Sequence, residues 1–72
     1  MTDMARMIRV NGESEPLAAA NLVALLQEKE IPADARGVAV ALNGAIVPRA
    51  DWATTRLRAG DSVEIVRARQ GG

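Results

Sequence analysis

The dipeptide Asn-Gly occurs twice in this chain of 72 residues, at Asn11-Gly12 and at Asn43-Gly44. Each copy follows a short run in which every second residue is a large apolar one, the period of a strand that buries one face. Asn-Gly is the strongest short signal for a two-residue hairpin turn, because both turn positions need a left-handed backbone. The sequence therefore predicts two β-hairpins, one near the start of the chain and one past its middle.

The first hairpin is predicted from Ile8 and Val10, which alternate with Met7 and Arg9. Its second strand is expected from about residue 13 to residue 17. Ser14 followed by Pro16 and three alanines is also typical of a helix start, with proline at the first helical position. The local rules leave both interpretations open for this segment.

Asn21 is the preferred start of the helix, because asparagine is a leading N-cap residue. The residues behind it repeat at i, i+3 and i+4, as the buried stripe of a helix does: they are Leu22, Leu25 and Leu26. We expect a helix over about 22–30 that covers one face of the sheet, and Pro32 prevents its continuation.

The second hairpin begins with a strand over 38–42, in which Val38, Val40 and Leu42 put bulk on one face. The alanines between them, Ala39 and Ala41, leave only methyl groups on the other face. After Asn43-Gly44, a short strand is expected at 46–47, because Pro48 cannot continue a sheet interior.

A connection follows that is long enough to need packing of its own, and Trp52 and Leu57 are its expected buried anchors. The last strand is predicted over 62–68, with Val63 and Ile65 on one face and the residues between them on the other. Two hairpins flanking one helix give a ββαββ order, an α+β pattern with a single helix over a mixed or antiparallel sheet.

Composition excludes most other kinds of site. The chain has no His, Cys, Phe or Tyr, and nine basic residues balance nine acidic ones. No thiolate or imidazole is available for catalysis or metal binding, so an enzyme would depend on a carboxylate or on Lys29. Zero net charge with one aromatic residue argues against nucleic acid, and no run is long enough for a membrane span or a secretory signal. We expect a cytoplasmic protein without a bound cofactor or metal.

The expected organisation is a disordered leader over 1–6, one domain over 7–68 and a flexible tail over 69–72. The tail reads Arg69, Gln70, Gly71 and Gly72. Two terminal glycines bury nothing, but they form a thin thread that carries a carboxylate and could enter a channel too narrow for a Cβ atom.

Several segments together resemble the ubiquitin-like, β-grasp sulfur carriers, and most closely the ThiS family of thiamine biosynthesis. The resemblance extends from about residue 7 to residue 72. It is carried by Leu42-Asn43-Gly44, Ile46-Val47-Pro48-Arg49, Trp52, the turn Leu57-Arg58-Ala59-Gly60-Asp61 and the terminal Gly71-Gly72. The Val-Pro-Arg-x-x-Trp segment is more similar to ThiS than to the small subunit of molybdopterin synthase.

The resemblance implies a β-grasp fold in which the first and last strands lie side by side and parallel, which favours a strand at Ser14. It also implies that a ThiF-like enzyme uses ATP to adenylate Gly72. A sulfur donor such as a cysteine desulfurase would then supply sulfur for a thiocarboxylate at Gly72, and a ThiG-like thiazole synthase would receive it. The carrier would be a cosubstrate rather than an enzyme, and a monomer when free.

Partner docking is expected on the sheet face away from the helix, a patch of small residues with a charged rim. Its candidates are Arg9, Ala39, Ala41, Glu64 and Val66. At the root of the tail, Arg67 and Arg69 could pair with acidic groups of the adenylating enzyme and steer the encounter. Gln70 and Gly71 would thread into the active sites ahead of Gly72.

Three alternatives remain at this stage. The small subunit of molybdopterin synthase, or another β-grasp carrier, would share the chemistry but serve a different acceptor. A β-grasp interaction module would end in Gly-Gly only incidentally. A modifier that is ligated to other proteins would form conjugates instead of carrying sulfur.

Overall fold

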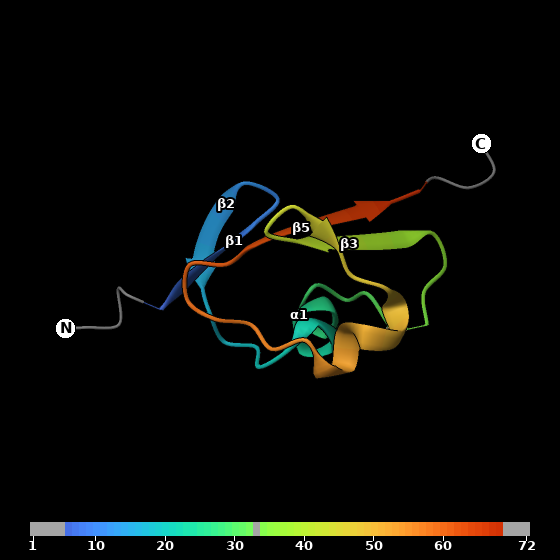
Figure 1. Ribbon diagram of the computed structural model, residues 1–72, viewed down its shortest axis with the longest axis horizontal. Coiled ribbons are helices and arrows are strands. Elements are labelled where there is room, and N and C mark those ends of the chain that lie inside the picture. The colour runs from blue at the N-terminus through green and yellow to red at the C-terminus, as the bar shows by residue number, and fades with distance from the viewer. Residues whose placement is uncertain (1–5, 33, 69–72) are drawn as a thin grey trace.

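The sheet of this protein has five strands, and one helix packs across one of its faces (Figure 1). The computed structural model describes residues 6–32 and 34–68. The elements in chain order are β1 (Met7–Val10), β2 (Glu13–Pro16), α1 (Leu22–Glu28), β3 (Val38–Leu42), β4 (Ala45–Ile46), the 3₁₀ helix η2 (Arg49–Thr54) and β5 (Ser62–Arg67). The order in the sheet is β2-β1-β5-β3-β4. The predicted α+β, β-grasp class is confirmed. The chain order is ββαβββ rather than ββαββ, because β5 adds a fifth strand after the second hairpin and lies between the two hairpins in the sheet.

Both Asn-Gly pairs form the predicted turns. Asn11 and Gly12 have φ angles of 52° and 87°, and Asn43 and Gly44 have φ angles of 52° and 88°. The antiparallel pairs β1–β2 and β3–β4 follow directly from these turns. Strand rather than helix is therefore the outcome at Ser14. The short strand β4 is one residue earlier than predicted, because the two-residue turn sets Leu42 opposite Ala45.

Strand β5 joins the two hairpins into one sheet. It pairs parallel with β1 through Arg9↔Ser62 and Val10↔Val63, as predicted. On its other side it pairs antiparallel with all of β3. The strand ends at Arg67 instead of Ala68, although the Ala68 N–H still donates to the Gly37 carbonyl at 2.6 Å.

Helix α1 begins as predicted, because the Asn21 side-chain oxygen accepts a hydrogen bond from the Ala24 N–H at 2.8 Å. It ends at Glu28, two residues before the predicted end. Glu30 has a left-handed φ of 65°, and its N–H donates to Gln27 while the Ile31 N–H donates to Leu26. These two bonds form a Schellman motif, which closes the helix and turns Ile31 into the core.

The core lies between α1 and the sheet, and η2 closes one side of it (Figure 1). Trp52 is 1% exposed, and its indole N–H donates to the Val47 carbonyl at 2.9 Å. Arg49 lies over the indole ring, 4.7 Å from its centroid, and also donates to the Ala35 carbonyl. The predicted burial of Trp52 and Leu57 is confirmed. The 3₁₀ conformation of their connection is not indicated by any apolar period in the sequence.

Candidate functional site

The sheet face away from α1 brings four of the predicted docking residues together. Ala39 lies directly opposite Val66, and Ala41 lies directly opposite Glu64. Because side chains alternate along each strand, all four are on the face away from the helix. Val66 is 62% exposed although it lies within the β3–β5 ladder. The structure therefore places these four residues in one continuous area.

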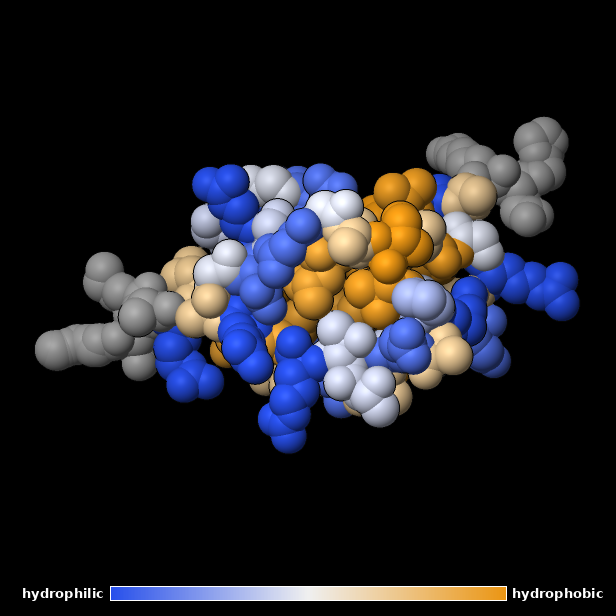
Figure 2. Space-filling view, viewed as in Figure 1, coloured by the Kyte–Doolittle hydropathy of each residue, from blue (hydrophilic) through white to orange (hydrophobic). Residues whose placement is uncertain are grey.

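Ile46 belongs to the same area, and sequence reasoning did not include it. It lies opposite Ala41 across the β3–β4 ladder and is 70% exposed. The register of a two-residue turn at Asn43-Gly44 could have placed it there, since that turn pairs residues 41 and 46. We call the residues Ala39, Ala41, Ile46 and Val66 the open-face patch. Figure 2 shows apolar side chains at the β3–β4 end of the sheet and also below it, between the sheet and α1, with hydrophilic side chains around them.

One charged residue borders the open-face patch, and a second lies farther along the same face of the sheet. Glu64 lies beside Ala41 in the register and is exposed. Arg9 is exposed on β1, where it pairs with Ser62, two residues before Glu64 on the same face. Neither side chain forms an ion pair within residues 6–32 and 34–68. A partner protein could therefore form one ion pair with Glu64 and another with Arg9.

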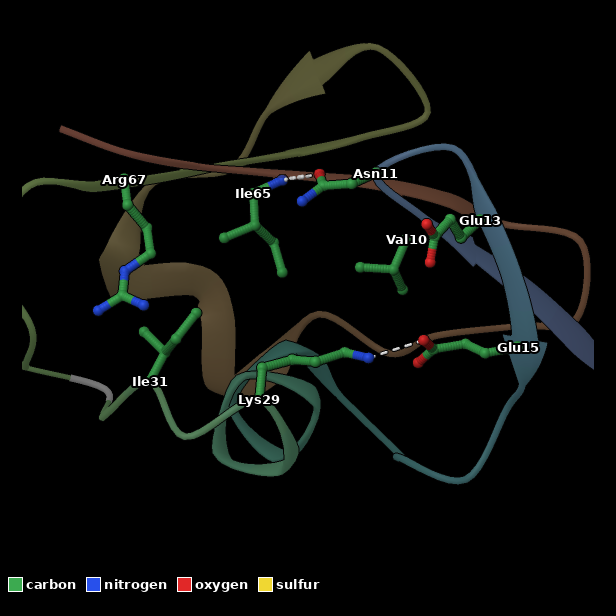
Figure 3. A pocket seen from close by; sticks show the side chains of 8 residues that line it. All are labelled: Val10, Asn11, Glu13, Glu15, Lys29, Ile31, Ile65 and Arg67. Atoms are coloured by element: carbon green, nitrogen blue, oxygen red, sulfur yellow. Dashed lines mark hydrogen bonds and ion pairs between the residues drawn. The ribbon is translucent and has the colours of Figure 1, made fainter.

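Arg67 is separate from these residues. By the alternation along β5 it lies on the same side as Val63 and Ile65, which face α1. Its side chain lines a cavity between β5, β2 and the end of α1 (Figure 3). The predicted tail residues Arg69, Gln70, Gly71 and Gly72 lie outside the described residues, which end one residue after Arg67 at Ala68.

The cavity has a volume of about 410 Å³. Its apolar lining comes from Val10, Ile31 and Ile65, and its polar lining from Asn11, Glu13, Glu15, Lys29 and Arg67. Lys29 Nζ pairs with a Glu15 carboxylate oxygen at 2.7 Å across one side, as Figure 3 shows. On the other side the Asn11 amide oxygen accepts a hydrogen bond from the Ile65 N–H at 2.8 Å.

Two further properties concern the part of the chain that the structure describes. No group of three or more His, Cys, Asp or Glu side chains there could hold a metal ion. Within the same residues, no helix is long and apolar enough to cross a membrane.

Comparison with known proteins identifies a family and related solved structures. The model of the ThiS family matches residues 4–72. A crystal structure of the thiamine biosynthesis protein ThiS from Geobacter metallireducens is 32% identical, with a TM-score of 0.73 over 92% of this chain and 99% of that one. A solution structure of a thiamine biosynthesis protein from the same organism is 30% identical, with a TM-score of 0.73 over 92% of this chain and 87% of the other. No curated protein matches the sequence.

The family match covers both hairpins, the helix, the Val-Pro-Arg-x-x-Trp segment and the final Gly-Gly. The two solved structures share the same arrangement of strands and helix over more than nine tenths of this chain. This chain therefore belongs to the ThiS family.

Proposed function

We propose that this protein is a sulfur carrier of thiamine biosynthesis, whose terminal Gly72 holds the sulfur as a thiocarboxylate. The observation that carries the proposal is the family match, which runs through Gly71-Gly72 to the last residue. The names of the two related structures place those proteins in thiamine biosynthesis. The chain would act as a cosubstrate of its partner enzymes.

The chemistry begins with a group that is unreactive on its own. A carboxylate is anionic and offers only oxide as a leaving group, so a ThiF-like partner first transfers AMP from ATP to Gly72 and releases pyrophosphate. Attack by the outer sulfur of a protein persulfide on this acyl-adenylate then releases AMP and forms an acyl disulfide, and a thiol reductant cleaves its S–S bond to leave the thiocarboxylate on Gly72. A cysteine desulfurase is the proposed source of that sulfur, and a thiazole synthase its acceptor. This route explains how a chain without cysteine can carry sulfur.

The open-face patch is the proposed docking surface for these partners. Two large apolar side chains, Ile46 and Val66, stand over 60% exposed on either side of the two alanines. Solvent-exposed apolar groups that are contiguous and rimmed by charge are typical of protein interaction sites. Arg9 and Glu64 would supply the polar rim, and Arg69, Gln70 and Gly71 would form the thread that reaches each active site.

Changes at the chain end test the proposal. Three variants are informative: one extra alanine after Gly72, deletion of Gly71 and Gly72, and Gly71→Val. The extra residue moves the carboxylate by up to about 3.6 Å, and an error of about 1 Å at a reacting centre can cost on the order of a hundredfold in rate. Gly71→Val keeps the length and adds only a branched side chain.

We expect all three variants to lose ATP–pyrophosphate exchange with the adenylating enzyme while they melt like the parent. In the parent, intact mass should rise by about 16 mass units as sulfur replaces oxygen. Arg58→Glu, an exposed change in the turn before β5, is the control and should retain both readouts. Exchange at the parental rate by the deletion variant would overturn the sulfur-carrier proposal.

A further inference from the structure

Strand β5 continues past the end of its parallel partner. The β1–β5 ladder holds only the pairs Arg9↔Ser62 and Val10↔Val63. At Asn11-Gly12 the chain turns back into β2, whereas β5 runs on to Arg67. Within residues 6–32 and 34–68, no strand pairs with this last part of β5 on the β1 side. The sheet therefore has an unfilled strand position next to β5.

The backbone groups that point into this position follow from the hydrogen bonds of the ladder. The Arg9 N–H donates to the Asp61 carbonyl at 3.0 Å, and the Asn11 N–H donates to the Val63 carbonyl at 2.9 Å. Successive residues of a strand direct their N–H and C=O groups to opposite sides, so Ile65 and Arg67 also face the β1 side.

The Asn11 side chain occupies only the first site of this edge, where it accepts from the Ile65 N–H. No described residue bonds to the Ile65 carbonyl or to the Arg67 N–H. One acceptor and one donor, spaced as in a β-ladder, are therefore open to a further strand.

Side chains next to this edge form a recess with different charges at its two ends. It is the cavity of about 410 Å³, within the size range of ligand pockets. Val10, Ile31 and Ile65 supply apolar surface, and Figure 3 shows Arg67 at one end and Glu13 at the other. Lys29 is neutralised by Glu15, but Glu13 and Arg67 form no ion pair with any described residue.

We propose that an extended segment of the adenylating enzyme binds here as an added strand beside Ile65–Arg67. This position and its recess are called the β5 slot. The inserted segment would bond to the Ile65 carbonyl and the Arg67 N–H and place an apolar side chain against Ile31 and Ile65. An acidic side chain of the segment would pair with the Arg67 guanidinium. In strand addition, main-chain hydrogen bonds supply affinity and side-chain pockets supply specificity.

The position of the slot indicates why an enzyme that acts on the chain end would use it. Arg67 is followed by Ala68 and then by the tail. A partner strand that pairs with the last residues of β5 would fix the direction in which the chain leaves the domain. Pre-ordering the reacting end lowers the entropy cost of reaching a productive geometry. The inference rests on the proposed function, because it names how the same partner holds the carrier.

Hydrogen exchange at the Arg67 amide tests the slot. The chain is compared alone and with an excess of its purified ThiF-like adenylating enzyme, at the same total carrier concentration. We expect exchange at Arg67 to slow by at least about tenfold in the complex, since an open edge amide becomes paired. Unchanged exchange in the complex overturns the proposal. Slowing in the carrier alone as its concentration rises would also overturn it, because a second copy would then fill the slot.

A matched pair of charge reversals gives a second test. Arg67→Glu should raise the Kd for the adenylating enzyme by about tenfold or more. Arg58→Glu changes another exposed arginine, which lies outside the slot, and should bind like the parent. Equal affinities of the two variants would overturn the slot. If the parent is adenylated but its Arg67 amide stays unprotected, only the slot is wrong. If the parent is never adenylated, the proposed function itself is wrong.

Discussion

The two faces of the sheet are made by the same strands but differ in what their residues must do. Toward α1, Ile8, Val40 and Val63 are at most 2% exposed. Away from α1, the neighbouring positions hold Ala39 and Ala41, and the large residues Ile46 and Val66 are 70% and 62% exposed. One face is filled by the protein itself, and the other presents apolar groups to solvent.

This difference separates the residues that stabilise the fold from those available for binding. Burying a large aliphatic side chain contributes about 1.5–3 kcal/mol, and Ile8, Val40 and Val63 each gain this. The open-face residues gain little of it in the free protein. Substitutions on the two faces should therefore affect different measurements, stability on the covered face and partner binding on the open face.

The largest effect is expected on the covered side, at Trp52. Trp52→Ala should cost about 3–5 kcal/mol, because it removes a fully buried ring and leaves a cavity. A domain of this size has a stability of only about 5 kcal/mol or slightly more, so a urea melt should find the variant largely unfolded. Trp52→Phe is the control: it keeps a ring, loses the hydrogen bond to Val47 and should cost less. If Trp52→Ala melts like the parent protein, Trp52 is not a buried anchor of the core.

A smaller effect, on a different measurement, is expected at Val66 on the open face. Val66→Asp should change the free energy of unfolding by about 0.5 kcal/mol or less, as exposed substitutions usually do. It should weaken binding of the adenylating enzyme by about tenfold, since a charge would enter the apolar centre of the interface. Calorimetric titration measures the affinity, and Thr54→Asp, exposed on η2, is the control. Unchanged affinity of Val66→Asp would move the docking site elsewhere.

The smallest effect is expected where the second hairpin is tied to β5. The Asn43 amide oxygen accepts from the Ser62 N–H at 2.9 Å, and its amide nitrogen donates to Asp61 at 3.1 Å. Asn43→Gly keeps the left-handed turn and removes both side-chain bonds, so it should cost about 1 kcal/mol. The midpoint of a thermal melt measures this loss. Affinity for the partner should change little, and a tenfold loss would indicate that the turn also positions Ile46.

Most of the fold follows from local signals in the sequence. Asn11-Gly12 and Asn43-Gly44 fix both hairpins, and Asn21 with the leucines behind it fixes the start of the helix. The structure differs from the prediction where other interactions override the local sequence preferences. The helix ends early because Glu30 adopts a left-handed backbone that is usually given to glycine. The 3₁₀ helix at Trp52 depends on contacts with the core, which no short-range period encodes.

The candidate site was less predictable than the core. Ala39, Ala41, Glu64 and Val66 were placed on one face by alternation alone, and the structure brings them together. The face on which Ile46 lies could be predicted only from the hairpin register, because a two-residue strand is too short to show alternation. The β5 slot arises because β1 is shorter than β5, which is a property of pairing between residues more than 50 positions apart. The role of Gly72 stays a prediction from the resemblance and the family.

The central position of β5 also has a consequence for the order of folding events. The turns of β1–β2 and β3–β4 close over two residues, so each hairpin can form early and at low entropic cost. The β1–β5 ladder joins residues that are far apart in the chain, such as Arg9 and Ser62. The chain between them loses conformational entropy before any contact of this ladder forms. We therefore expect the β1–β5 ladder to form after both hairpins, so that the last strand of the domain is fully paired only once the sheet is complete.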